Sequence, residues 1–158
     1  MNLTDFTRPG LVVASLRGKD AAAVIRELSE AMGREGVIRE SESFYRAVLE
    51  REHLCGTDTE AGWALPHARV KGLGKPWFAL GRTSAPMGWG AGTNRVQLIF
   101  LLAAPDPDDV GSYLKLIASL ARLSKNKELC ERLLRAGDSF EMLESLREVS
   151  APAASAVS

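Results

Sequence analysis

The chain has 158 residues and a mass of 17.1 kDa, with 46% hydrophobic and 25% charged residues. This length fits one domain, and the average composition excludes coiled coils, collagen-like repeats and disordered chains. Twenty basic residues balance twenty acidic ones, so the sequence lacks the positive charge typical of proteins that bind nucleic acid or membrane surfaces. Only two histidines and two cysteines are available for chemistry near neutral pH.

The sequence also indicates a compartment. Residues 1–10 lack a basic stretch followed by an apolar core, so we expect no signal peptide. The longest apolar run, residues 98–104, is far shorter than the roughly 20 residues that span a bilayer. Cys55 and Cys130 are too few and too far apart for a secreted disulfide framework. We therefore expect a cytoplasmic protein with two reduced thiols and no membrane insertion.

The first third of the chain predicts a strand and two helices. Residues 11–16 are an apolar run typical of a short strand. Asp20 is a candidate N-cap for a helix that the glycines within residues 33–36 end. Its apolar face comprises Val24, Ile25, Leu28, Ala31 and Met32. A second helix is expected to open between residues 41 and 43 and to end near residues 51–52.

The middle of the chain predicts strands and loops. We expect strands over residues 61–65, 77–83 and 96–103, and loops over residues 84–94 and 105–109. Pro66 is expected to terminate the first of these strands, because proline cannot donate to a ladder. The third strand is almost entirely apolar, which indicates that both of its faces are covered.

The last part of the chain is expected to be helical from Tyr113 onward, followed by a flexible tail over residues 151–158. The residues expected to form its apolar faces are Leu114, Ile117, Ala118, Leu120, Ala121, Leu129, Leu133, Leu134, Phe140, Met142, Leu143 and Leu146. Helices at both ends of a strand-rich centre predict a single α/β domain over residues 1–150, with a sheet covered by helices.

His67 is the most informative candidate for chemistry. It follows Pro66 at the expected end of an apolar strand, where side chains leave the core for a cleft. An imidazole there is nucleophilic near neutral pH, and Arg69 stands two residues away. Arg51 and Arg82 lie in segments that can converge on it, and arginines attract phosphate or carboxylate groups. The alternative is a histidine that merely ends a strand.

Other chemical motifs find less support in the sequence. A metal site built from His53, Cys55 and His67 would have only three soft ligands with no repeated spacing, so we expect no metal. The glycines within residues 88–92 are followed by an apolar strand rather than a helix, so we expect a turn and no nucleotide site. No serine lies in a nucleophile-elbow pattern, which disfavours a hydrolase that uses His67 as general base.

Several motifs together resemble a known family. Arg51-Glu52, Thr57 and the run from Gly62 to Arg69 are similar to the signature of enzyme IIA domains of the fructose/mannitol/nitrogen-regulatory branch of the bacterial phosphoenolpyruvate:sugar phosphotransferase system. The resemblance continues through Gly88-Trp89-Gly90 and the later apolar strand and helix, and covers about residues 3–148.

The resemblance implies a fold and an activity. Residues 1–150 would form one type-2 enzyme IIA domain, a mixed, roughly five-stranded sheet with helices packed on both faces. His67 would accept a phosphoryl group from the phosphocarrier HPr or its nitrogen-branch paralogue, without a cofactor. It would pass this group to an enzyme IIB or keep it as a regulatory mark. Arg51 would help to stabilise the transferred group, and Thr57 would support the histidine or the phosphate by hydrogen bonding.

Two departures from the family pattern bear on this expectation. Many members carry a second histidine where this sequence has Tyr113, which can donate a hydrogen bond but cannot share the charge of an imidazole. Asp58-Thr59-Glu60 replaces a small, glycine-containing segment, and its carboxylates would repel phosphate if they pointed inward. The alternative function is therefore a regulatory domain without phosphorylation that controls a transporter or kinase. A nitrogen-regulatory type is expected over a sugar-specific one, as either a monomer or a homodimer.

Overall fold

The computed structural model describes residues 2–107 and 109–150, so the expected tail over residues 151–158 lies outside the described part. Two short 3-10 turns, Leu3–Phe6 and Pro9–Leu11, open the chain. The elements that follow are β1 (Val12–Val13), α1 (Ala21–Arg34), α2 (Ser41–Leu54), β2 (Trp63–Ala64), β3 (His67–Lys71), β4 (Trp77–Gly88), β5 (Arg95–Asp106), α3 (Val110–Leu123), α4 (Lys127–Arg135) and α5 (Ser139–Ser150).

The strands form a mixed five-stranded sheet, as expected. β4 lies between β1 and β5, and the far side of β5 pairs with both β2 and β3. β4 and β5 are antiparallel, whereas the other pairs are parallel. β5 is buried along almost its whole length, because strands flank both of its edges and helices cover both of its faces.

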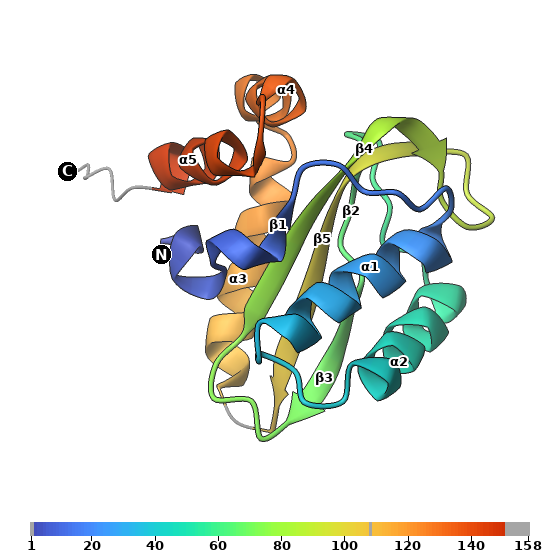
Figure 1. Ribbon diagram of the computed structural model, residues 1–158, viewed down its shortest axis with the longest axis vertical. Helices are drawn as coiled ribbons and strands as arrows, with labels where there is room; N and C mark the ends of the chain where they lie inside the picture. The colour runs from blue at the N-terminus through green and yellow to red at the C-terminus, as the bar shows by residue number, and fades with distance from the viewer. Residues whose placement is uncertain (1, 108, 151–158) are drawn as a thin grey trace.

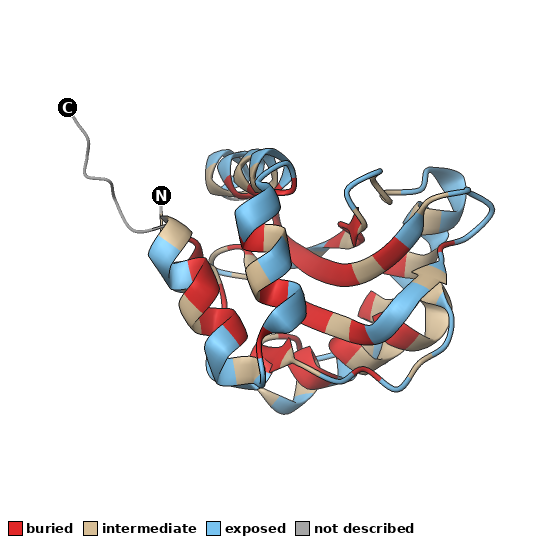
Figure 2. Ribbon diagram, turned by 90° about the horizontal axis from the view of Figure 1, so that it is seen from above, coloured by how far each residue is buried: buried red, intermediate tan, exposed pale blue. Residues whose placement is uncertain are grey.

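Helices pack on both faces of this sheet, which confirms the predicted architecture (Figure 1). α1 and α2 cover one face with apolar side chains such as Ile25, Leu28 and Phe44. α3, α4 and α5 bury Leu116, Leu133 and other residues in the core on the other side. Figure 2 shows the same division along each helix, with buried residues on the inner side and exposed residues outward.

The N-cap of α1 is as predicted, since the Asp20 carboxylate accepts the Ala23 N–H at 2.8 Å. β1 is shorter than the strand expected over residues 11–16, because the 3-10 turn at Pro9–Leu11 takes its first residue. The segment after Val13 continues beside β4 only through isolated bonds, such as the Leu16 N–H to the Arg82 carbonyl at 2.9 Å.

β2 ends before Pro66, as predicted, but the expectation that His67 lies at the end of a strand was wrong. Pro66 lacks an N–H, so the ladder to β5 is interrupted there, but its carbonyl still accepts the Leu102 N–H at 2.9 Å. The chain therefore runs on beside β5 as β3, and His67 opens a strand instead of ending one.

Two of the expected loops are partly strand. β4 runs on to Gly88 through a register shift between Arg82 and Met87, and β5 extends through Pro105 to Asp106. Phe140 does not join the apolar face of α5, since its side chain is 67% exposed near the start of that helix. None of the helices in the described ranges is long and apolar enough to cross a bilayer.

Candidate functional site

His67 lies at the start of β3, on the face of the sheet that α3 covers. The alternation of a strand places His67, Arg69 and Lys71 on this face and turns Ala68 and Val70 toward α2. On the α3 side, the ring of Tyr113 approaches the imidazole with a centroid separation of 6.2 Å. The polar residues of β3 therefore gather where α3 begins.

One hydrogen bond fixes the orientation of the imidazole. His67 Nδ1 lies 2.9 Å from the carbonyl oxygen of Leu65. A carbonyl can only accept, so Nδ1 is the protonated nitrogen in this contact. In the neutral ring the lone pair is then on Nε2. The contact with Leu65 therefore determines which tautomer the neutral ring adopts.

The C-terminal end of α2 supplies the rest of the site. Arg51, Glu52 and Leu54 from its last turn, Cys55 and Thr57 from the following turn, and His67 line a hollow of about 330 Å³, here named the His67 hollow. Leu54 is 80% exposed at its rim. α2 continues to Leu54, beyond the end expected near residues 51–52, and this extra turn forms one wall of the hollow.

A chain of hydrogen bonds holds Thr57 against the segment that carries His67. The Thr57 hydroxyl donates to Glu52 Oε1 at 2.9 Å and accepts the Leu65 N–H at 3.0 Å. Glu52 Oε2 also accepts the Thr57 N–H at 2.7 Å and the indole N–H of Trp89 at 2.7 Å. Thr57 thus contacts the backbone N–H of Leu65, the residue whose carbonyl orients His67.

Glu52 and Trp89 are site residues that the sequence analysis did not predict as such. Glu52 stands in the Arg51-Glu52 motif, and that motif was the only signal that could have found it. Trp89 is 1% exposed and lies in the turn between β4 and β5. Its contact with Glu52 is set by tertiary packing.

Positive charge surrounds the Tyr113 phenol. Burial raises the pKa of Tyr113 above its ordinary value. The nearby positive charges of Arg51 and Arg69 act against this shift and lower the pKa. Burial is the larger effect, so the phenol stays neutral and keeps its O–H as a donor at physiological pH. The structure therefore brings Arg51, Arg69 and Tyr113 together on one side of His67.

Arg82 does not join this site, which corrects the expectation that it can converge on His67. Its guanidinium donates to the carbonyls of Leu133 at 2.9 Å and Ala136 at 2.7 Å, and its Nε donates to the Ala14 carbonyl at 3.1 Å. These acceptors include the free carbonyls at the C-terminal end of α4, where a cation is favoured. Arg82 joins the sheet to that helix.

The acidic segment after Thr57 points away from the His67 hollow. The Asp58 carboxylate accepts the Asn94 side-chain N–H at 2.9 Å, which ties it to the turn before β5. Glu60 lines a separate hollow together with Arg95. Glu52 is thus the carboxylate that lines the His67 hollow, and its oxygens are occupied by Thr57 and Trp89.

Within residues 2–107 and 109–150, no group of three or more His, Cys, Asp or Glu side chains could hold a metal ion. His53 and Cys55 are exposed at the end of α2. The expected turn between β4 and β5 is present over residues 89–94, with Gly90 at a φ of 59°.

Fold and site define a small α/β domain in which one histidine opens a strand beside the end of a helix. Solved structures have the same fold. The crystal structure of nitrogen regulatory protein IIA-Ntr from Neisseria meningitidis matches with a TM-score of 0.80 and 24% identity, over 90% of this chain and 97% of that one. Enzyme IIA in the complex of enzyme IIAMtl and phosphorylated enzyme IIBMtl from Escherichia coli matches with a TM-score of 0.69 and 20% identity, over 87% and 94%.

Residues 5–149 match the family model described as phosphoenolpyruvate-dependent sugar phosphotransferase system, EIIA 2, and the chain belongs to this family. It is 29% identical to the 2-O-alpha-mannosyl-D-glycerate-specific EIIABC component of Escherichia coli over 92% of this chain, but spans only 22% of that relative. It is 27% identical to a nitrogen regulatory protein of Bradyrhizobium diazoefficiens, over 87% of this chain and 90% of the relative.

Proposed function

We propose that the chain carries a phosphoryl group on His67 as part of the phosphoenolpyruvate-dependent phosphotransferase system. The observation that carries this proposal is the bond between His67 Nδ1 and the Leu65 carbonyl, which leaves the lone pair on Nε2. Phosphoryl transfer asks a protein mainly for positioning and for stabilisation of charge. A fixed imidazole beside Arg51 and Arg69 supplies both.

In the proposed step, the Nε2 lone pair attacks the phosphorus of the phosphorylated carrier in line with the leaving group. A new N–P bond forms while the bond from phosphorus to the donor side chain breaks, and the donor keeps that electron pair. The Leu65 carbonyl holds the Nδ1 proton and balances the positive charge that develops on the ring. Arg51 and Arg69 neutralise the phosphoryl oxygens, and the neutral Tyr113 phenol donates to one of them.

The proposed donor is an HPr-type phosphocarrier, and an enzyme IIB or a regulated transporter or kinase would receive the group or its signal. The Escherichia coli enzyme IIA of similar fold was solved bound to phosphorylated enzyme IIB, which supports such a partner. The exposed Leu54 lines the His67 hollow at the end of α2, and the exposed Leu114 follows Tyr113 in α3, so both offer apolar contacts to a docking protein. We propose the nitrogen-regulatory type, which is supported by the 27% identity to the Bradyrhizobium nitrogen regulatory protein.

The test uses the complete chain, phosphoenolpyruvate, enzyme I and a phosphocarrier. Intact mass should rise by one phosphoryl group that acid removes, and phosphorus NMR should place the group on Nε2. His67→Ala should abolish the increase, whereas His53→Ala, which changes the only other histidine, should leave it intact. Equal labelling of wild type and His67→Ala contradicts the proposal. A faster reaction with the nitrogen-branch carrier than with HPr supports the nitrogen-regulatory type.

The second candidate is a regulatory binding domain that acts without phosphorylation. Tyr113, in the place of a second imidazole, is the observation that favours it, because a neutral phenol cannot share positive charge with His67. This function predicts a transporter or kinase partner whose affinity is the same for wild type and His67→Ala, and a chain that takes up no phosphoryl group.

A further inference from the structure

The outer edge of β3 is free beyond His67. The Pro66 carbonyl bonds to β5, and backbone groups alternate along a strand, so the N–H and C=O groups of Arg69 and Lys71 point away from β5. In the described part of the chain, no hydrogen bond from outside the sheet reaches these groups. An edge strand of this kind is a template for pairing with another chain.

The neighbouring edge of β2 differs, because the preceding segment covers it. The Thr59 N–H donates to the Trp63 carbonyl at 2.8 Å, and the Leu65 N–H donates to the Thr57 hydroxyl at 3.0 Å. This covering by the preceding segment ends at His67, whose ring contacts the Leu65 carbonyl. The open edge is thus confined to the last residues of β3.

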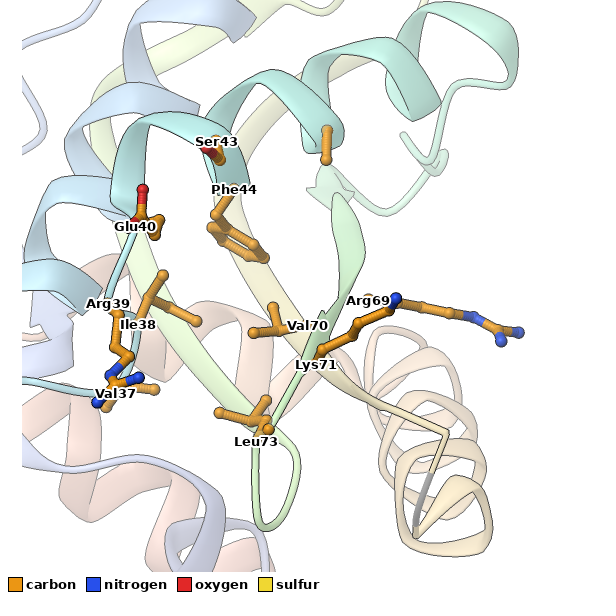
Figure 3. Close-up of a pocket in the computed structure, with 12 residues that line it drawn as sticks. Val37, Ile38, Arg39, Glu40, Ser43, Phe44, Arg69, Val70, Lys71 and Leu73 are labelled. Carbon is orange, nitrogen blue, oxygen red and sulfur yellow. The ribbon is translucent and has the colours of Figure 1, made fainter.

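An apolar pocket of about 310 Å³ lies beside this open edge, between β3 and α2 (Figure 3). Figure 3 shows Phe44, Ile38, Val70 and Leu73 directed toward one another, with Arg69 directed away from them. The exposed residues Ser43 and Ala47 of α2 form part of its lining. Small side chains on α2 leave room for a neighbouring strand to place a side chain in the pocket.

Unpaired cations surround the pocket and the edge. Arg39, Arg69 and Lys71 form no ion pair or side-chain hydrogen bond with the rest of the described chain. Glu40 is the only acidic residue in the lining of the pocket. Arg69 and Lys71 share the α3 face of β3, while the pocket lies on the opposite face, next to Val70.

We propose that β3 and this pocket form a docking site for an extended, acidic segment of a partner protein. The segment adds a strand to β3 through the N–H and C=O groups of Arg69 and Lys71. One apolar side chain enters the pocket, and the residues on either side of it point to the other face, opposite Arg69 and Lys71. The recognised pattern is therefore an apolar residue between two acidic ones.

A second copy of this chain is a poor occupant of the same edge. Two β3 strands paired edge to edge would bring Arg69 and Lys71 of one copy against the same cations of the other. Like charges placed directly opposite each other destabilise a strand pair. Charge complementarity thus selects a different, acidic chain, and the site requires no phosphoryl transfer.

A displayed library of random peptides, selected against the immobilised complete chain, tests this inference. We expect enriched sequences with an acidic–apolar–acidic core. A synthetic peptide from the selection should shift the amide resonances of Arg69 and Lys71 and slow their hydrogen exchange. Lys71→Glu should weaken its binding by about fivefold or more, while Lys125→Glu, a matched charge reversal at an exposed turn, should not.

Two variants of Lys71 distinguish the contribution of its backbone N–H to binding from the contribution of its side-chain charge. Lys71→Gln removes only the charge, whereas Lys71→Pro also removes the outward N–H at a position where an edge strand tolerates proline. Weaker binding by Lys71→Pro than by Lys71→Gln supports strand addition. Three results overturn the inference: no enrichment, enrichment of basic sequences, or peptides that bind equally to Lys71→Pro and wild type. Concentration-dependent dimers that Lys71→Pro abolishes would assign the edge to a second copy and would also overturn it.

Discussion

The indole N–H of Trp89 donates to the carboxylate of Glu52 at 2.7 Å, and so joins the turn between β4 and β5 to the last turn of α2. The same carboxylate receives both donors of Thr57. Hydrogen bonds through Glu52 and Thr57 therefore connect the buried Trp89 to Leu65, whose carbonyl orients His67. Glu52 acts as a positioning residue in this arrangement.

Glu52→Gln should lower both stability and the rate of His67 phosphorylation. An amide has one acceptor oxygen and would turn its NH2 group toward the donors of Thr57 or Trp89. Loss of hydrogen bonds to a charged acceptor costs about 2 kcal/mol. Urea unfolding measures the loss, and nitrogen NMR of the His67 ring reports whether Nδ1 remains the protonated nitrogen. Glu50→Gln, at an exposed position on the same helix, is the control. Identical behaviour of the two variants would show that Glu52 does not position His67.

Tyr113 should titrate above its ordinary pKa of 10.0, because burial outweighs the nearby positive charges. The chain has two tyrosines, so absorbance in a Tyr45→Phe background follows Tyr113 alone. Arg69→Gln should raise the pKa of Tyr113 further, since one of the opposing charges is lost. The folded state holds the proton more tightly than the unfolded state. Its contribution to stability is thus complete below pH 10.0 and is lost as pH rises through the folded pKa. Titration at or below 10.0 would contradict the burial argument.

Arg82→Met should destabilise the protein and leave the site intact. The guanidinium supplies hydrogen bonds to the end of α4 and to the Ala14 carbonyl, and their loss should lower the free energy of unfolding by about 2 kcal/mol. Arg95→Met, which removes one exposed bond to the Pro86 carbonyl, should cost much less. At a temperature where both variants are folded, both should phosphorylate His67 like wild type. A defect in His67 phosphorylation that is specific to Arg82→Met would show that Arg82 takes part in the site.

Removing the acidic charges after Thr57 should not accelerate phosphoryl transfer. Asp58→Asn with Glu60→Gln keeps an acceptor for Asn94 and deletes two charges that do not line the His67 hollow. We expect the rate of phosphorylation to change by less than about twofold, since neither carboxylate lines the hollow and solvent screens the exposed Glu60. A clear acceleration in a stopped-flow or quench experiment would show that these carboxylates repel the phosphoryl group after all.

The mixed five-stranded sheet and its helix-covered faces followed from family resemblance, and the N-cap at Asp20 followed from local sequence. The N-cap depends on local pattern, which a single sequence displays, whereas the strand number and mixed pairing were implied by the family motifs. β3 was missed because His67–Lys71 alternates polar and apolar residues over only five positions, directly after a proline. Its strand state depends on β5, which pairs with it along its whole length.

The parts of the site that the sequence left hidden depend on distant partners. Arg82 was expected near His67 because arginines attract phosphate, yet its acceptors belong to α4 and to the segment after β1. Glu52 and Trp89 lie 37 residues apart in the sequence and meet only through tertiary packing. The predicted roles of His67, Arg51, Thr57, Arg69 and Tyr113 remain predictions until the phosphorylation experiment is done.

The ladder to β5 is interrupted at Pro66, but β2 and β3 pair with β5 in the same register. Ala64 lies opposite Ile99 and His67 lies opposite Leu102, so both strands advance by the same number of residues across the break. One residue inserted there would turn His67 toward α2 and expose an apolar neighbour to the α3 side, since strand faces alternate. The length of this segment therefore determines which face of β3 carries the imidazole.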